Sequence, residues 1–205
     1  MASGDCKEMS WIDSISDTAS MNRTKIRQRY YSSKVYFKAK SDFVEKPIPP
    51  AGLLGAWELV EKNRNSFVVF DPFGGIMDQI PSSEIPYPHR AGNLYSIQYQ
   101  IQWKDSSKDA VSIAWMRSLY QYMTPYVSNS PRASYVNFVD LDLGVAPNGT
   151  ATVEEARSWG EKYFADNYDR LVKVKSTIDP NNVFRNSQSI PVQTASPEWS
   201  NTTTE

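Results

Sequence analysis

The sequence has very little of two residue types on which several large protein classes depend. Its 205 residues include one cysteine, Cys6, and one histidine, His89. A single cysteine excludes an internal disulfide framework and any zinc site built on several cysteines. A Ser-His-Asp hydrolase would have to rely on His89 alone. Because that ring lies in a proline-rich loop, we expect it to make a structural hydrogen bond rather than to catalyse a reaction.

The sequence also lacks an excess of positive charge and any long hydrophobic run. Lys and Arg number 22 against 23 for Asp and Glu, so there is no surplus to neutralise a phosphate backbone, and nucleic acid is not an expected partner. No apolar stretch approaches the roughly 18 residues that a membrane span needs. The first residues have neither the apolar core nor the cleavage site of a signal peptide.

Three N-x-Ser/Thr triplets nevertheless suggest secretion. They begin at Asn22, Asn148 and Asn201, and the first two are candidate glycosylation sites. Such triplets also arise by chance. Secretion without a signal peptide is a conflict that disappears if the chain is the later part of a longer protein. Residues 193–205 are polar and are expected to form a disordered tail.

The clearest structural signal is a two-residue alternation over residues 94–103. One face of this strand would carry Tyr95, Ile97, Tyr99, Ile101 and Trp103, and the other would carry Leu94, Ser96, Gln98, Gln100 and Gln102. The polar face could simply meet water, as one face of an antiparallel sheet often does. Alternatively, it could roof a polar pocket, where glutamines would orient a ligand through hydrogen bonds without adding charge.

The rest of the sequence mixes helices and strands. Helices are predicted over residues 6–21, 50–60, 109–122 and 152–172, and extended segments over 30–44, 66–70, 77–80 and 135–143. Thr152 with Glu155, and Ser106 with Asp109, have the spacing of capping boxes. The elements do not alternate as βαβ units, so the predicted class is α+β. No phosphate-binding loop, nucleophile elbow or zinc-binding helix motif is present.

Two of the predicted helices carry apolar stripes. The first stripe is Val111, Trp115, Leu119 and Tyr122, and the second is Trp159, Tyr163 and Phe164. Such spacing is typical of a helix face that packs on a core. We therefore interpret both stripes as packing rather than as part of a site.

Several longer strings follow one another in a recognisable order. They are DCKEMSWI (5–12), FKAKSDFVEKPIP (37–49), DPFGGIMDQI (71–80), IPYPHRAGNLYSIQYQIQW (85–103), YVNFVDLDLG (135–144) and WGEKYFADNYDRLVKVKSTIDPNNVFRNSQSIP (159–191). Together they resemble the C-terminal part of plant berberine bridge enzyme-like proteins, a family of FAD-linked, reticuline oxidase-like oxidases. The resemblance covers residues 5–192.

The resemblance implies a fold. Residues 1–130 would be part of the substrate-binding domain of a vanillyl-alcohol-oxidase-type flavoenzyme, an antiparallel sheet flanked by helices. Residues 131–192 would be the berberine-like C-terminal segment. The family holds its FAD mainly through an N-terminal domain that has no counterpart in this sequence. Full-length members are secreted or vacuolar.

The resemblance also implies a function. Family members take a hydride from a C–H next to oxygen or nitrogen in a small molecule, such as an alcohol, alkaloid, phenolic or carbohydrate, and O2 is the expected acceptor. Because the flavin supplies the chemistry in such enzymes, the 205 residues alone are expected to be colourless and inactive.

Family positions can be carried over at only a few residues. Gln98 matches a substrate-contacting Glu or Gln, and as an amide it can orient a substrate but cannot act as a base. Ser96 precedes it on the same predicted face and is a candidate substrate contact. Asp71 matches a pocket position and could be an acid or base if buried, although a turn or capping role is equally compatible.

A second group of family positions lies in residues 135–144. Tyr135 and Asn137 match residues near the flavin, and Tyr135 is also a candidate substrate contact. Phe138 stands where some relatives use a tyrosine as the catalytic base. It can line the substrate pocket but has no hydroxyl to exchange a proton. Val139 replaces the usual arginine and removes a charged contact.

Two other interpretations remain open at this point. The chain could be a non-catalytic polypeptide: a truncated gene product, a decoy or an extracellular binding module. It could also be one half of a two-chain assembly whose flavin domain is a separate polypeptide. The interpretations differ in whether flavin-binding sequence accompanies these residues.

Overall fold

The computed structural model describes residues 7–29 and 34–193 and divides the chain into two units, Met1–Val35 and Tyr36–Glu205. The first unit contains helices α1 (Trp11–Thr18) and α2 (Arg23–Ile26), which confirms a helix within residues 6–21. Ser10 and Asn22 cap their N-termini, since each side chain accepts a backbone N–H of the first turn. Cys6, Asn201 and the predicted tail from residue 194 lie outside the described residues.

The second unit is built on a three-stranded antiparallel sheet. Its strands are β1 (Tyr36–Val44), β2 (Ser66–Pro72) and β3 (Tyr95–Trp103), in the order β1-β3-β2. The alternation predicted for β3 is confirmed, since Ile97, Tyr99 and Ile101 are at most 1% exposed. The central position of β3 explains why its pattern is the clearest in the sequence.

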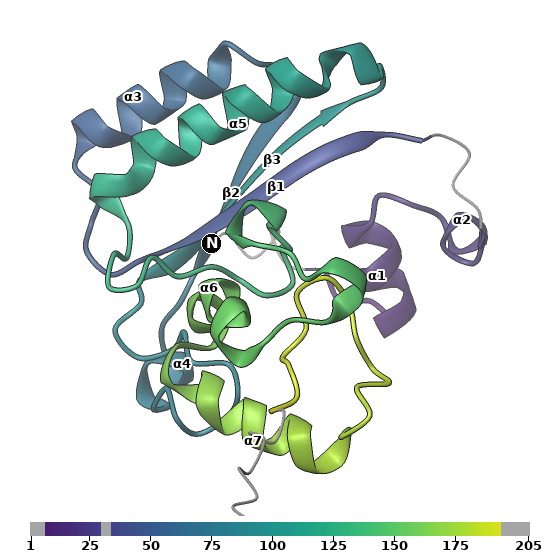
Figure 1. Cartoon of the computed structure of the whole chain (residues 1–205). Helices are drawn as coiled ribbons and strands as arrows, with labels where there is room; N and C mark the ends of the chain where they lie inside the picture. The colour runs from purple at the N-terminus through teal and green to yellow at the C-terminus, as the bar shows by residue number, and fades with distance from the viewer. Residues whose placement is uncertain (1–6, 30–33, 194–205) are drawn as a thin grey trace, which may run out of the picture. The chain divides into compact units, whose positions relative to one another are not determined.

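Two helices cover one face of this sheet (Figure 1). They are α3 (Pro50–Glu61) and α5 (Asp109–Met123), and Met116, Leu119 and Met123 of α5 pack on the odd-numbered residues of β3. The stripe predicted for α5 is confirmed at Trp115, Leu119 and Tyr122, which belong to this core or pack against it, and is wrong only at Val111, which is 62% exposed. The buried face instead begins at Ser112, because α5 contacts both β1 and β3 and turns that side toward the sheet.

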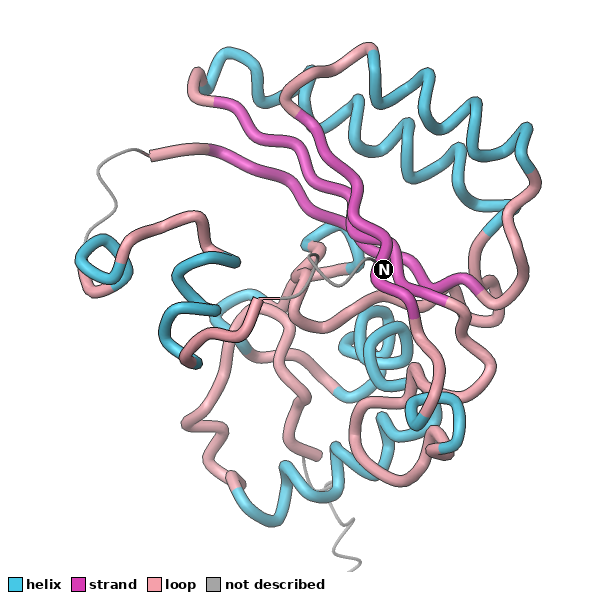
Figure 2. The backbone as a smooth tube through the Cα atoms, turned by 180° about the vertical axis from the view of Figure 1, so that it is seen from behind, coloured by secondary structure: helices cyan, strands magenta, loops and turns pink. Residues whose placement is uncertain are grey.

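Helices α6 (Val153–Phe164) and α7 (Tyr168–Ile178) lie on the other side of the sheet (Figure 2). Thr152 and Glu155 form the predicted capping box. The single helix predicted over 152–172 is wrong, because the chain breaks at Ala165, whose φ is +45°. The break folds Tyr168 back on α6 at Gly160, where a Cβ would come within 2.2 Å of the tyrosine ring. Trp159 and Tyr163 are buried in this second core, as predicted.

Three local predictions are also wrong. Residues 76–79 form a short helix, α4 (Ile76–Gln79), rather than a strand. Ser106 begins a 3₁₀ turn, Ser106–Lys108, and the side chain that caps it is Asp105. Residues 135–143 form a turn and the 3₁₀ helix Leu141–Leu143 instead of a strand. Local hydrogen bonds replace sheet pairing here, since the N–H of Phe138 donates to the carbonyl of Tyr135. Further 3₁₀ turns are Thr124–Tyr126, Pro147–Gly149 and Ala165–Asn167.

Candidate functional site

Three of the predicted site residues share one face of the sheet. In the strand register, Ser96 pairs with Phe43 of β1 and Asp71 of β2, and Gln98 is next along β3 on the same face. Directly paired residues of antiparallel strands point the same way. Ser96, Gln98 and Asp71 therefore lie together on the face opposite α3 and α5.

The Tyr135 turn is attached to this face by a serine of β1. The backbone N–H of Tyr135 donates to Ser41 Oγ over 2.8 Å, and Ser41 Oγ is 2.9 Å from Ser134 Oγ. Ser41 is fully buried and pairs with Gln98 across the sheet. The structure thus places the start of the 135–144 motif beside the strand that carries Gln98.

Aromatic rings and one amide surround Tyr135. Asn137 Nδ2 donates to Tyr135 Oη over 2.7 Å. The ring of Phe138 meets that of Tyr135 edge-on at 4.9 Å, and the ring of Tyr87 does so at 5.8 Å. Burial raises the pKa of Tyr87 to about 12, so its phenol stays protonated at neutral pH. Tyr135, Asn137 and Phe138 therefore form one cluster, although no strand aligns them.

His89 adjoins this cluster, since its ring meets that of Tyr87 edge-on at 5.5 Å. Its ring stacks on Phe43 with centroids 4.0 Å apart, and its Nε2 lies 3.1 Å from the carbonyl oxygen of Tyr163. Burial lowers the pKa of His89 to about 4, so the ring is neutral at pH 7. The predicted structural hydrogen bond is present.

The remaining predicted residues differ in exposure. Gln98 is half-buried, and its Nε2 lies 3.3 Å from Gln100 Oε1. Asp71 is exposed in this structure. The sequence predicted an acid or base role for Asp71 only if its side chain were buried, so that condition is not met. Asn22 and Asn148 are both exposed, so a glycan could reach either. Within residues 7–29 and 34–193, no group of three or more His, Cys, Asp or Glu side chains could hold a metal ion.

Sequence reasoning missed a cluster of buried charges beside β1. Lys40 Nζ lies 2.5 Å from Asp140 and 2.9 Å from Asp142, and Lys38 Nζ lies 2.7 Å from Asp140. The side chains of Lys40 and Asp140 are at most 3% exposed. Arg117 of α5 adds a fork to Asp142, and with the two lysines it holds the pKa of Asp142 well below its usual range. These pairs fix the 135–144 motif on β1.

A second buried pair lies further along the same strand. Both carboxylate oxygens of Asp42 accept from Arg132 at 2.6 Å, and the guanidinium lies 3.3 Å from the ring centroid of Tyr120. The only signal in the sequence was the lysine and aspartate alternation in 38–42. That alternation does not identify partners some 90 to 100 residues away.

The chain resembles known proteins in both sequence and structure. The family model described as berberine and berberine like matches residues 134–191. Berberine bridge enzyme-like D-1 of Nicotiana tabacum is 47% identical, over 92% of this chain and 37% of its own length. Tetrahydroberberine oxidase of Berberis wilsoniae is 46% identical, over 91% and 37%.

Solved structures agree with these similarities. BBE-like #28 of Arabidopsis thaliana has a TM-score of 0.82 and 40% identity, over 95% of this chain and 42% of its own. Berberine bridge enzyme of Eschscholzia californica has a TM-score of 0.83 and 36% identity, over 96% and 41%. The chain thus spans less than half the length of the relatives that it matches.

Proposed function

We propose a function for this chain from its membership of the berberine bridge enzyme-like family, whose vanillyl-alcohol-oxidase-type fold it shares in part. As part of a longer FAD-linked oxidoreductase, it would roof the space in which a small molecule meets the flavin. One observation supports this function above the others. Residues from β2, β3 and the 135–144 motif, which are far apart in the sequence, converge on one face of the sheet.

The residues on this face suit contact with a flavin ring but not the holding of the whole cofactor. Gln98, Asn137 and Tyr135 offer amide and hydroxyl groups, and Phe138 offers an apolar edge, which together match a planar ring with polar edges. The sequence contains no phosphate-binding loop of the P-loop or dinucleotide-binding type to hold the diphosphate of FAD. Tyr135 and Asn137 are therefore proposed as flavin contacts, with most of the FAD bound elsewhere.

In the proposed reaction, each side chain on this face would have one role: binding the substrate, excluding water or receiving a proton. FAD, when bound, would accept the hydride and pass two electrons to O2. Ser96 and Gln98 would hold the polar group next to the reacting C–H, and Phe138 and Tyr135 would wall the pocket against water. Asp71 is the only ionisable side chain that the three strands place on this face. It is exposed in this chain, so it could receive the proton lost from the substrate only if the rest of a longer protein buries it.

The test restores the missing part of the protein. The portion of the Nicotiana tabacum D-1 protein that this chain does not match is joined to it, and flavin content and oxidation of alcohols, alkaloids, phenolics and carbohydrates are measured. We expect bound FAD and oxidation of at least one class. Gln98→Ala should lower kcat/KM by about 10- to 100-fold, the equivalent of one or two lost hydrogen bonds. Gln102→Ala, at the exposed end of the same strand face, is the control and should change it by less than about 2-fold.

The same measurements separate catalysis from a non-catalytic role. The chain alone should be colourless, and stoichiometric FAD in that preparation would contradict the assignment of the cofactor to a separate region. A joined protein that binds FAD but oxidises no member of the four classes would favour a binding or vestigial role. Equal kcat/KM values for wild type and Gln98→Ala would remove Gln98 from the site.

A further inference from the structure

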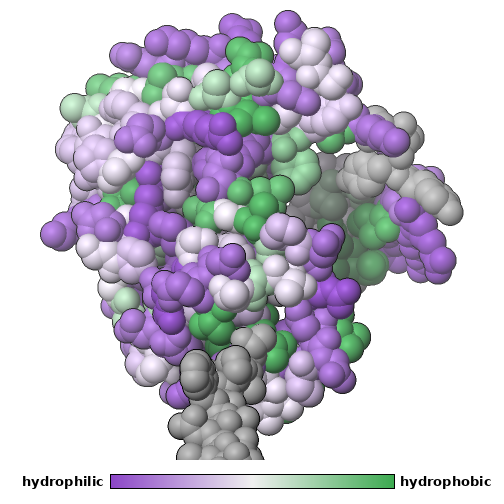
Figure 3. Space-filling model, viewed as in Figure 1, coloured by the Kyte–Doolittle hydropathy of each residue, from purple (hydrophilic) through white to green (hydrophobic). Residues whose placement is uncertain are grey.

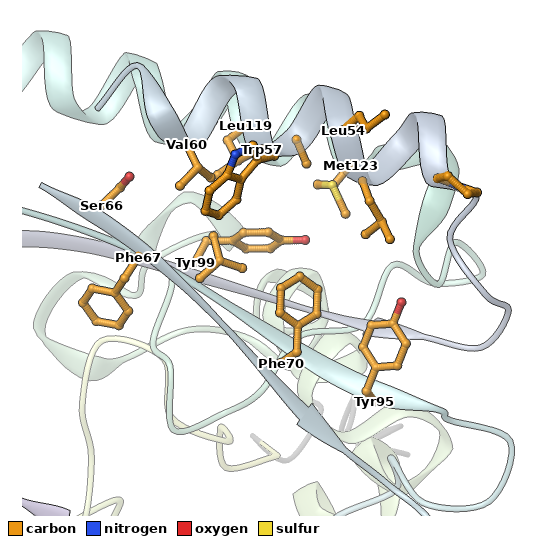
Figure 4. A pocket seen from close by; sticks show the side chains of 14 residues that line it. Leu54, Trp57, Val60, Ser66, Phe67, Phe70, Tyr95, Tyr99, Leu119 and Met123 are labelled. Atoms are coloured by element: carbon orange, nitrogen blue, oxygen red, sulfur yellow. The ribbon is translucent and has the colours of Figure 1, made fainter. Parts of the chain in front are cut away.

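The two sides of the sheet are packed by different interactions. On the side of α3 and α5, the pocket in Figure 4 is lined mostly by aliphatic and aromatic side chains, among them Trp57, Phe70 and Tyr95, and none of its lining residues is charged. Apolar contacts of this kind are not directional. On the opposite side, a buried network of hydrogen bonds, which do have preferred directions, reaches the end of the 135–144 motif.

This network centres on Gln188, which comes from the end of the described chain. Its Nε2 donates to the carbonyl oxygens of Asp140 and Gly144 over 2.9 and 2.7 Å, and its Oε1 accepts from Tyr163 Oη over 2.8 Å. Gln188 is 8% exposed, so these bonds lie in the interior of the protein. One side chain thus holds the carbonyl groups of the two residues that flank the 3₁₀ helix Leu141–Leu143.

Tyr163 makes a second contact with the same residue. Its hydroxyl donates to Gln188 and also accepts the backbone N–H of Asp140 over 3.2 Å. Burial raises the pKa of Tyr163, so the hydroxyl stays protonated and can donate at neutral pH. Because Lys38 and Lys40 bind the carboxylate, the N–H, the carbonyl and the side chain of Asp140 are all bonded to other segments.

The proposed flavin contacts lie in a turn between two buried anchors. The turn begins at Tyr135, whose N–H donates to Ser41, and ends at Asp140. Between them, Asn137 and Val139 are exposed, and Asn137 donates to Tyr135 within the same turn. The face of the molecule in Figure 3 is largely hydrophilic with small hydrophobic groups, so exposure by itself does not distinguish this turn. The position of the turn therefore depends on the bonds beneath it.

We propose that Tyr163 and Gln188 are positioning residues for the candidate site, and that through Asp140 they set where Tyr135 and Asn137 meet the flavin. Both side chains are buried, so they act through the turn and do not touch the substrate or the flavin themselves. A misplacement of about 1 Å can lower a rate by about 100-fold, so such a restraint matters for activity. The inference rests on the proposed function for the identity of the site, but the restraint is a property of the 205-residue chain.

Two conservative variants of the 205-residue chain provide a matched comparison. Tyr163→Phe removes the hydroxyl of the network and keeps the aromatic ring in the core. Tyr168→Phe removes the hydroxyl of an equally buried tyrosine in the same core, which donates to the carbonyl of Val153 over 2.7 Å. Each variant loses one buried hydroxyl, so both should fold, and their Tm values should fall by a similar few degrees.

Hydrogen exchange in the free chains measures the restraint without flavin. The amides of Tyr135 and Phe138 should exchange at least about 5-fold faster in Tyr163→Phe than in wild type, and within about 2-fold of wild type in Tyr168→Phe. Gln188→Met keeps a side chain of similar length and removes all three amide bonds, so it should accelerate the same amides further. Unchanged exchange in Tyr163→Phe or Gln188→Met, or equal acceleration in Tyr168→Phe, would overturn the inference.

The chain joined to the unmatched portion of the Nicotiana tabacum D-1 protein measures the consequence for the site. There, Tyr163→Phe should shift the absorption spectrum of the bound FAD and lower kcat/KM by about 5- to 10-fold, whereas Tyr168→Phe should change neither. A purely structural role would lower Tm in both variants and leave the spectrum and kcat/KM unchanged, and that result would contradict the inference. A joined protein without FAD would count against the proposed function alone, because exchange in the free chain still decides whether the two residues hold the turn.

Discussion

The two edges of the sheet show opposite solutions to the same problem. At β1, the backbone N–H of Ser128 donates to the carbonyl of Phe43, and buried carboxylates pair with Lys38 and Lys40. At β2, the outer backbone is unpaired and Phe70 is half-exposed. Because the strands are of similar length and pair with the same central strand, the difference lies in what the rest of the chain supplies. The described chain provides a cover for β1 and none for β2.

The comparison of the two edges also shows that buried ion pairs select one arrangement of the chain, whereas exposed apolar side chains do not. A buried ion pair adds little net stability over an apolar pair, but it penalises any arrangement that leaves one partner alone. The pairs at β1 therefore select the position of the 135–144 motif, which carries proposed site residues. The apolar side chains exposed along β2 impose no such pairing requirement, because apolar contacts are not directional.

The largest effect should come from removing Asp140, one of the two most buried carboxylates at the β1 edge. Asp140→Ala leaves Lys40 buried without its nearest partner, and we expect the free energy of unfolding to fall by about 3–5 kcal/mol. Urea denaturation measures it. Asp169→Ala, which removes an exposed partner of Arg157, is the control and should have a much smaller effect. Similar losses in both variants would show that burial of the β1 charges has no special cost.

The second prediction compares the loss of stability when each of two directly paired residues, one on β2 and one on β3, is replaced by alanine. Ile97 is fully buried and Phe70 is half-exposed, although their Cα atoms pair directly. Ile97→Ala should cost about 2–5 kcal/mol, and Phe70→Ala about 1 kcal/mol or less in the free chain. Equal losses in urea denaturation would mean that the β2 edge is covered in solution.

The dependence of stability on pH should test the burial of His89, which lies against β1 at Phe43. The pKa of His89 is about 4 in the folded protein and 6.5 ordinarily, so the unfolded chain binds the proton more tightly. Stability should therefore be fully present above pH 6.5 and fall by up to about 3 kcal/mol as the pH drops to 4. His89→Gln should lose less stability over this range. Parallel pH profiles for the two proteins would contradict a buried neutral ring, and the single histidine signal in NMR reports its pKa directly.

The smallest effect should come from removing an exposed partner of the ion pairs at the β1 edge. Arg117 lies 2.6 Å from Asp142, but its side chain is 60% exposed. Solvent screens such a pair, and Asp142 keeps its contact with Lys40 when Arg117 is removed. Arg117→Ala should leave the urea midpoint nearly unchanged. A loss comparable to that of Asp140→Ala would mean that the arginine, rather than the lysines, holds the 135–144 motif.

The elements that the sequence predicted well are those with a strong local or periodic signal. The alternation in β3 and the capping box at Thr152 were both found in the structure. Predictions failed where the deciding interaction was not local. Residues 135–143 looked extended, but Ser41 and the β1 lysines bind this segment as a turn. The helix over 152–172 breaks at Ala165, because Tyr168 packs back on Gly160.

By itself, the sequence determined which residues could share a strand face and, through its motifs, which family the chain belongs to. Periodicity is a property of neighbouring residues, so it can be read without knowing the fold. Only the tertiary structure decided that Lys40 and Asp42 would be buried, because Asp140 and Arg132 reach them from about 90 to 100 residues away. It also decided which edge stays open. The cover of an edge strand comes from distant parts of a chain, and no local pattern records it.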